Sequence, residues 1–281
     1  MLSYRHAFHA GNHADVLKHF TLWLVLDYFN RKDKPYWYID THSGAGVYDL
    51  SGGEAQKVGE YRDGIGRIQA ADGLPPLLAD FAAHVRASLP SENLYCGSPL
   101  LAESLLREGD KMRLFELHPA DFRHLKNNFA EAEKRRRAIV KQENGWQGLT
   151  ALLPPPTRRA VVLIDPPYEE KQDYTRAVQS LKEALKRFAQ GCYLLWYPCL
   201  SREESRKLPE QLKKLSPDAY LHAELHVRAP RADGFGMHGS GMFVINPPYL
   251  LAQQLEQTLP FLTQCLAQDA GARFVLDGRS K

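Results

Sequence analysis

The sequence predicts a doubly wound α/β fold, in which helices cover both faces of a mostly parallel sheet. Short apolar runs alternate along the chain with stretches of helical periodicity, a pattern typical of parallel sheets buried on both faces. A seven-stranded sheet is expected, with strands at residues 35–40, 112–116, 138–144, 160–165, 192–196, 224–227 and 241–245. No long helix separates the last two runs, so the last strand is expected to be antiparallel.

The first elements follow from apolar spacing and turn residues. A helix is expected at residues 14–30, before the first strand, which ends in Asp40 and a glycine-containing turn. Over sixty residues then precede the second strand, whereas a whole strand–helix–strand unit needs about thirty. We therefore expect a helical insert at residues 50–94, with helices at 59–71 and 75–89, inside a single domain of residues 1–281.

The later helices start and stop at recognisable signals. After the insert, Ser98 is expected to cap the next helix, with Pro99 in its first turn. The strand at 160–165 is the clearest in the chain, because a continuous apolar run is stopped by two prolines. The segment 174–188 has apolar residues at helical spacing and is expected to cover one face of the sheet.

Composition excludes several classes of protein. The chain has 281 residues, of which 44% are hydrophobic and 25% charged, so disorder and low complexity are not expected. Its net charge of +3 is too small to indicate nucleic-acid binding by itself. The four cysteines form no C-x-x-C pair, which argues against a disulfide framework or a zinc knuckle.

Location and assembly follow from what the sequence lacks. The apolar stretch at residues 20–26 is far shorter than the ~20 residues of a membrane span. No leader-like segment precedes it, so a cytoplasmic protein without membrane contact is expected. No extended apolar seam lies outside the expected core, which favours a monomer.

Asp165-Pro-Pro-Tyr168 is the most informative motif. The two prolines stop the strand and let the carbonyl of Pro166 project beside the carboxylate of Asp165. Together these groups offer two acceptors to an exocyclic –NH₂, and Tyr168 offers a ring that can stack on a base. The alternative is a strand stop with a surface tyrosine. Ligands bind at the carboxyl ends of strands in open α/β sheets, which favours the functional interpretation.

A second such motif, Asn246-Pro-Pro-Tyr249, follows the last strand. If that strand is antiparallel, its end lies at the opposite edge of the sheet from the ligand site. Asn246 is therefore expected only to end the strand.

Three other strand ends carry residues suited to a nucleotide. The Asp40–Gly46 turn contains small residues that permit close approach of a ligand. Glu116 could receive the hydroxyls of a ribose, and Asn144 with Gly145 could contact an adenine edge. A dehydrogenase is disfavoured because the turn lacks G-x-G-x-x-G. Each residue could also simply close a strand.

Other features leave alternatives open. His9 and His13 are spaced i, i+4, but no H-E-x-x-H or nearby cysteine completes a site, so no metal is expected. The basic block 134–137 could meet phosphate or be a solvated helix end. The glycine-rich loop 234–241 could be a lid over a base or merely a permissive loop.

The order of these motifs resembles that of S-adenosyl-L-methionine-dependent amino-methyltransferases. More narrowly, the chain is similar to the 23S ribosomal RNA adenine-N6 methyltransferase J family. The resemblance covers nearly the whole chain and is weakest in the insert and the last thirty residues. It is carried by residues 1–19, 40–42, 61–67, 97–100, 116–119, 163–168, 196–198 and 240–248.

The resemblance implies a Rossmann-like class I methyltransferase that places a methyl group on N6 of a specific adenine in 23S rRNA. Asp165 would be the proton acceptor, assisted by Pro166 and Tyr168. The family more often has aspartate at the position of Asn144, a change that a backbone contact would survive. S-adenosyl-L-methionine would be bound by His19, His42, Ser98, Glu116, Asn144, Gly145 and Asp165, and the RNA by Tyr4, His6 and Lys18.

Three alternatives remain at this stage. A DNA adenine-N6 methyltransferase would carry the same motif, although an insert of about forty-five residues is small for a separate sequence-reading domain. A non-catalytic nucleic-acid binding protein could keep the fold, although the intact Asp165 motif argues against it. The amine of guanine or cytosine could also be the acceptor.

Overall fold

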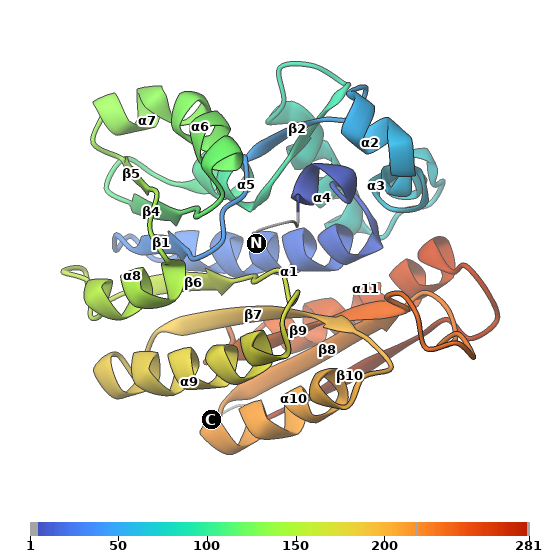
Figure 1. Ribbon diagram of the computed structural model, residues 1–281. Coiled ribbons are helices and arrows are strands. Elements are labelled where there is room, and N and C mark those ends of the chain that lie inside the picture. Colours follow the sequence, from blue (N-terminus) through green and yellow to red (C-terminus); the bar gives the residue numbers. More distant parts are fainter. Residues whose placement is uncertain (1–4, 217, 280–281) are drawn as a thin grey trace.

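The central sheet has eight strands in the order β10-β8-β9-β7-β6-β1-β4-β5 (Figure 1). The structure is a computed structural model that describes residues 5–216 and 218–279. Five strands run parallel: β1 (Trp37–Asp40), β4 (Lys111–Phe115), β5 (Ala138–Lys141), β6 (Ala160–Ile164) and β7 (Cys192–Cys199). The other three are β8 (Tyr220–His226), β9 (Gly239–Ile245) and β10 (Arg273–Arg279). β9 is antiparallel to both β7 and β8, and β10 is antiparallel to β8.

The seven predicted strands are all present in the central sheet, where the expected strand count was one too low; the two-stranded sheet of β2 and β3 was not expected. The missed strand, β10, pairs only with β8 at the edge of the sheet. Its residues are exposed or only partly buried, so it lacks the apolar run that marks a buried strand. The predicted antiparallel arrangement of the last two expected strands, β8 and β9, is confirmed.

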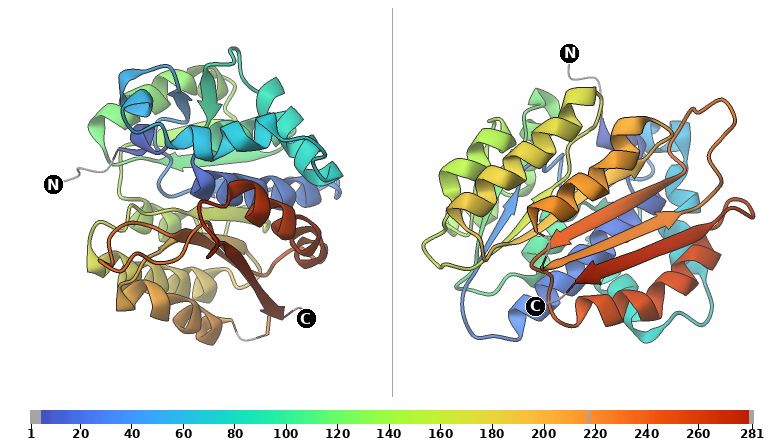
Figure 2. Two further views of the ribbon diagram at one scale, coloured as in Figure 1. Left: turned by 90° about the vertical axis from the view of Figure 1, so that its right-hand side faces the viewer. Right: turned by 90° about the horizontal axis from the view of Figure 1, so that it is seen from below.

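Helices cover both faces of the sheet (Figure 2). One face packs against α1 (His13–Asn30), α5 (Ser98–Leu105) and α11 (Leu251–Leu266), and also against α6 (Pro119–Asn128) and α7 (Ala130–Lys134). The other face packs against α8 (Gly145–Leu152), α9 (Lys171–Arg187) and α10 (Glu203–Leu215). The nearly continuous burial of α1 reflects its position between the sheet, α5 and α11.

The segment after β1 forms a small layer that shares the hydrophobic core of α1 and α11. β2 (Val47–Asp49) and β3 (Leu94–Cys96) pair antiparallel, and the chain between them is helical. The helices there are α2 (Gly53–Val58), the 3₁₀ turn η2 (Glu60–Asp63), α3 (Ile65–Ala70) and α4 (Pro76–Ala87). α3 and α4 pack against α11. A further 3₁₀ turn, η1 (His6–Phe8), precedes α1. Within residues 5–216 and 218–279, no helix is long and apolar enough to cross a membrane.

Asn246 ends β9 at the edge of the sheet opposite the carboxyl ends of the parallel strands, as predicted from the antiparallel direction. Its backbone has φ 52°, a left-handed conformation that asparagine tolerates better than most residues. Its side-chain amide donates to the carbonyls of Ala189 and Gly191, both at 2.8 Å. Asn246 therefore joins the end of β9 to the turn before β7.

We expect Asn246→Ala to lower the free energy of unfolding by about 1–3 kcal/mol, because two hydrogen bonds and a favourable left-handed residue are lost. Asn246→Gly removes the same hydrogen bonds without backbone strain, so its free energy of unfolding should fall less than that of Asn246→Ala. Urea unfolding of the three proteins measures both effects. Equal stability of the wild type and Asn246→Ala would contradict this role.

Candidate active site

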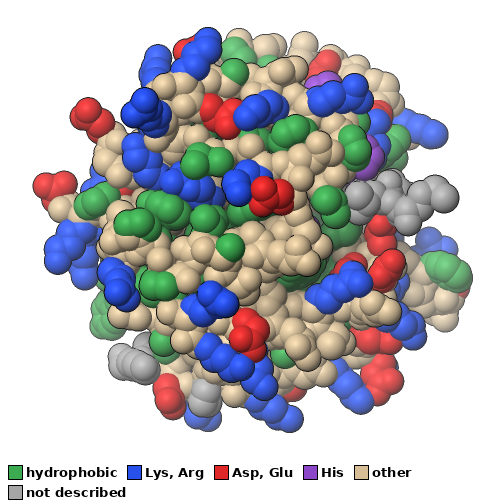
Figure 3. Space-filling model, turned by 60° about the vertical axis from the view of Figure 1, so that its left-hand side comes forward, with side chains coloured by type: hydrophobic (Ala, Val, Ile, Leu, Met, Phe, Trp, Pro, Cys, Tyr) green, Lys and Arg blue, Asp and Glu red, His purple; other side chains and the backbone are tan. Residues whose placement is uncertain are grey.

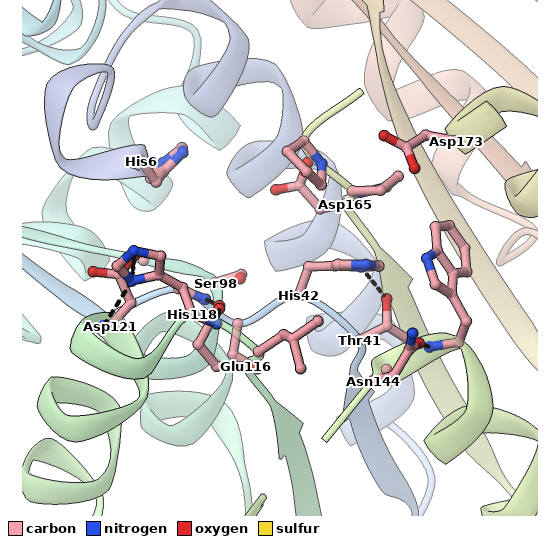
Figure 4. Close-up of a pocket in the computed structure, with 18 of the residues that line it drawn as sticks. His6, Thr41, His42, Ser98, Glu116, His118, Asp121, Asn144, Asp165 and Asp173 are labelled. Carbon is pink, nitrogen blue, oxygen red and sulfur yellow. Dashed lines mark hydrogen bonds and ion pairs between the residues drawn. The ribbon is translucent and has the colours of Figure 1, made fainter. Parts of the chain in front are cut away.

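A cavity of about 180 Å³ lies at the carboxyl ends of β1, β4, β5 and β6. Figure 4 shows His42, Glu116 and Asn144 around it, with Asp165 on the far side from Glu116. Tyr4 lies outside the described residues, and Tyr168 does not line this cavity. The predicted site residues that line it are His6, Lys18, His19, His42, Ser98, Glu116, Asn144, Gly145, Asp165 and Pro166.

The turn after β1 is organised by the buried carboxylate of Asp40. It accepts hydrogen bonds from the hydroxyls of Tyr38 and Ser98, both at 2.7 Å, and from the backbone of His42 at 3.2 Å. Burial raises the pKa of Asp40 to about 6. The prediction that Ser98 caps α5 is wrong: Gly97 is the N-cap, and the Ser98 hydroxyl is taken by Asp40 instead of the helix backbone.

Glu116 follows β4 and joins two loops of the cavity wall. Its Oε2 accepts from the backbone N–H of Gly44 at 2.8 Å and its Oε1 from that of His118 at 2.7 Å. Each oxygen retains a further lone pair, so the carboxylate can still accept from a ligand hydroxyl. Burial raises the pKa of Glu116 to about 7.

This raised pKa of Glu116 predicts a pH-dependent stability. The folded protein holds the Glu116 proton more tightly than the unfolded chain, and this tighter binding stabilises the fold. The stabilisation is fully present below pH 4.5 and is lost as the pH rises through about 7. Glu116→Gln should remove up to about 3 kcal/mol of that change. Urea unfolding of both proteins between pH 4.5 and 8 measures it. Parallel stability profiles for the wild type and the variant would contradict the assignment.

Asn144 and Gly145 start α8. The predicted strand to residue 144 is too long, because β5 ends at Lys141 and Asn144 instead caps α8, accepting from Trp146 N at 3.0 Å. A Cβ on Gly145 would lie 1.9 Å from the carbonyl oxygen of Thr41. This position therefore requires glycine, since the two loops touch backbone to backbone.

Two rings form a wall of the cavity beside α8. His42 and Trp146 meet edge to face, with centroids 4.8 Å apart. Burial lowers the pKa of His42 to about 3, so its imidazole is neutral. His19 also lines the cavity, but it is nearly fully buried and its Nδ1 lies 2.8 Å from the hydroxyl of Tyr95.

Asp165 lies directly after β6 and is held by Lys18 from α1. Lys18 Nζ is 2.6 Å from Asp165 Oδ2 and 2.8 Å from Asp15 Oδ1. Burial alone would lower the pKa of Lys18, but the two carboxylates raise it above its usual value. The ammonium is thus a buried positive charge beside Asp165, and only 4% of the Lys18 surface is exposed.

Asp15 is the residue that sequence reasoning missed. Besides Lys18, its carboxylate contacts His6 Nε2 at 2.9 Å and the backbone N–H of Gly11 at 2.8 Å. Burial would raise the pKa of the Asp15 carboxyl, but His6 and Lys18 hold it well below its usual range. The i, i+3 spacing of Asp15 and Lys18 was the available signal, since it places both on one side of a helix.

Tyr168 is buried, so the alternative of a surface tyrosine is wrong. It is 3% exposed, and its hydroxyl donates to the carbonyl of Trp196 at 2.8 Å. Its backbone has φ 52°, a strained value for an aromatic residue. The ring packs against Tyr174 and Trp196.

A second cavity, of about 520 Å³, adjoins the first. Asp165, Lys18, His6 and Pro167 line both cavities. The remaining wall comes from the start of α1, η2, Tyr168, the end of β7 and the loop before β9. Asp165 therefore stands at the junction of two adjacent spaces.

Two other candidate features border the second cavity. His9 and His13 line it, with His9 Nδ1 3.0 Å from Glu60, and so do Gly236 and Met237 of the glycine-rich loop. In the described part of the chain, the one cluster with metal-ligand spacing is Cys199, Glu224 and His226, where His226 Nε2 lies 2.7 Å from the carboxylate. Figure 3 shows Lys and Arg side chains spread over one face with acidic side chains among them, so charge alone does not mark a binding surface.

Comparison with known proteins gives a consistent result. A family model described as "Ribosomal RNA large subunit methyltransferase D, RlmJ" matches residues 33–276. A Haemophilus influenzae protein named ribosomal RNA large subunit methyltransferase J is 44% identical over 280 residues, 99% of this chain and 98% of its own. An Escherichia coli protein of the same name is 47% identical over 264 residues, 93% of each chain. The crystal structure of a Legionella pneumophila protein has a TM-score of 0.87 at 33% identity, covering 97% of this chain and 99% of that one.

Proposed function

Because the chain belongs to the ribosomal RNA large subunit methyltransferase J family, we propose that it methylates the exocyclic N6 amine of one adenine in 23S rRNA. Its family is one of methyltransferases, and we propose S-adenosyl-L-methionine as the methyl donor, which the polar and aromatic lining of the first cavity suits. Its substrate as a class is the RNA of the large ribosomal subunit, in line with the names of both relatives. That the methylated base is adenine and the methylated atom is N6 is the more specific part of the proposal.

The position of Asp165 between two cavities carries this proposal. The first cavity offers polar groups and two aromatic rings, which suit a cofactor with an adenine, a ribose and an amino acid. The second is open beside Asp165 and suits a base withdrawn from its stack. Asp165 would then face both the methyl donor and the acceptor.

The residues at the junction suit an amine acceptor. Asp165 Oδ2 is occupied by Lys18, while Oδ1 and the carbonyl of Pro166 accept no hydrogen bond from any residue in the ranges 5–216 and 218–279. These two oxygens can accept the two hydrogens of an –NH₂ group. Such bonds favour a tetrahedral nitrogen, whose lone pair is no longer delocalised into the ring and can be directed at the methyl group. Asp165 can then receive the proton that the methylated amine loses. The contact with Lys18 fixes the carboxylate in place.

The cofactor's contacts are assigned to the walls of the first cavity. Glu116 would accept from the ribose, His42 and Trp146 would flank the adenine ring, and Asn144 with Gly145 would meet its edge. Ser98 and the first N–H groups of α5 would lie toward the carboxylate of the methionine part, which a helix N-terminus favours. The bound cofactor supplies an electrophilic methyl group.

Tyr168 and His6 are assigned to the substrate, and the expected RNA contact of Tyr4 stays a proposal. Lys18, which was also expected to contact RNA, is instead buried between Asp15 and Asp165. Tyr168 would line the base cavity, and its hydroxyl bond to Trp196 fixes the ring there. His6 borders both cavities, which supports a contact with the substrate. We also propose that the protein acts as a monomer, without a metal, in the cytoplasm where its RNA substrate would be found.

The choice of polymer is tested by competition. Unmodified 23S rRNA, 16S rRNA and duplex DNA are incubated together with enzyme and methyl-labelled cofactor, and the label in each polymer is measured. We expect label in 23S rRNA alone. Label in duplex DNA would favour a DNA methyltransferase instead. Cofactor binding without transfer to any RNA, including immature large subunits, would favour a binding protein.

A further inference from the structure

The loop between β8 and β9 exposes a phenylalanine. Phe235 is 76% exposed, which forgoes the favourable burial of a large aromatic ring. Tyr249 is the other strongly exposed aromatic side chain of the described residues, at 79%. It follows β9 and Asn246 at the opposite edge of the sheet.

The loop that carries Phe235 is held together by its own contacts. Arg228 donates to the carbonyl of Met237 at 2.9 Å, and Asp233 accepts from the backbone N–H of Phe235 at 3.0 Å. Arg231 in turn lies 2.8 Å from Asp233. The backbone around Phe235 is therefore fixed by neighbouring side chains while its ring remains in solvent.

The loop forms part of the wall of the proposed base cavity. Gly236, Met237 and Arg228 line the second cavity together with Asp165 and other residues, and Phe235 directly precedes Gly236. Figure 2 shows this loop in orange in the left view. Phe235 is therefore the exposed neighbour of a residue that lines the same cavity as Asp165.

We propose that Phe235 stacks on an RNA base next to the target adenine, once that adenine has left its stack. Proteins that bind unpaired nucleotides place aromatic rings on the faces of bases, because every base offers a π face. Removal of the adenine leaves its neighbour with one uncovered face. Arg228 and Arg231 add positive charge to the same loop, which suits the adjoining phosphates. This inference rests on the proposed RNA methyltransferase function.

The test compares three variants on unmodified 23S rRNA. Phe235→Ala should raise KM for RNA by about 5- to 100-fold, the effect of losing one stacked base, with unchanged cofactor affinity and melting temperature. Phe235→Tyr keeps a ring and should stay within about threefold of the wild type. Tyr249→Ala removes an equally exposed aromatic side chain at the far edge and should leave KM unchanged.

Each other outcome overturns the inference in a recognisable way. Equal KM values for Phe235→Ala and wild type would remove Phe235 from RNA binding. A similar loss in Tyr249→Ala would indicate a nonspecific surface effect. A loss seen only on immature ribosomal subunits, and not on naked RNA, would mean that Phe235 contacts a protein. If the wild type methylates no RNA, the proposed function itself is wrong, and this outcome is distinct from a failure of the Phe235 inference.

Discussion

Asp165→Asn is expected to lower kcat for RNA methylation by about 10²- to 10⁴-fold, the usual value of a positioned proton acceptor. The substitution preserves shape but replaces one acceptor oxygen by an –NH₂ donor, and it removes the charge that faces Lys18. The amine would lose an acceptor for one of its hydrogens. Initial rates at saturating RNA and cofactor measure the effect.

Cofactor affinity separates this effect from misfolding. The assigned cofactor contacts lie mainly on Glu116, His42 and α8, so the cofactor Kd of Asp165→Asn should remain within about threefold, less than one hydrogen bond is worth. Asp27→Asn alters a surface carboxylate paired with Arg31 and serves as the control. Retention of wild-type kcat by Asp165→Asn would exclude Asp165 from the chemistry.

Lys18→Met is expected to lower the free energy of unfolding by about 3–5 kcal/mol. Lys18 is buried between Asp15 and Asp165, so its removal leaves two carboxylates close together without a cation. The depressed pKa of Asp15 would rise toward its usual value or above it. In the wild type, the lowered pKa of Asp15 stabilises the fold above the unfolded-state pKa, and this stabilisation is lost as the pH falls through the folded-state pKa. In Lys18→Met this stabilisation would be smaller.

A double variant tests whether this loss comes from the unpaired charge. Asp15→Asn combined with Lys18→Met removes one carboxylate with its cation and should regain part of the lost stability. The rate of methyl transfer should be below that of the wild type in Lys18→Met and in the double variant, because both lack the Lys18 ammonium that contacts Asp165. The single variant Asp15→Asn completes the comparison in urea unfolding. If the stability loss of the double variant equals the sum of the losses of the two single variants, Asp15 and Lys18 act independently, which would contradict their contact.

Most of the sheet could be predicted from the sequence because its parallel strands are buried on both faces. The run before Asp165 is apolar throughout and ends at two prolines, so its strand was evident. β10 was missed because an edge strand with only one neighbour needs no continuous apolar run. The hydrophobic pattern of β10 was therefore too weak to predict a strand there.

The strand ends converged as predicted because parallel strands end at one edge of a sheet. Glu116, Asn144 and Asp165 accordingly border one cavity. The link between Lys18 and Asp165 could not be predicted, because it joins positions 147 residues apart and depends on how α1 packs on the sheet. The burial of Tyr168 likewise depends on Trp196, which lies on another strand.

The identity of the methylated nucleoside tests the central claim most directly, because Asp165 and Pro166 are assigned to an exocyclic amine. Unmodified 23S rRNA is methylated with labelled cofactor, digested to nucleosides, and separated against standards. We predict that the label is found in N6-methyladenosine and is lost with Asp165→Asn. Label in 1-methyladenosine, a ring-nitrogen product, or in the amine of guanosine or cytidine would contradict the account.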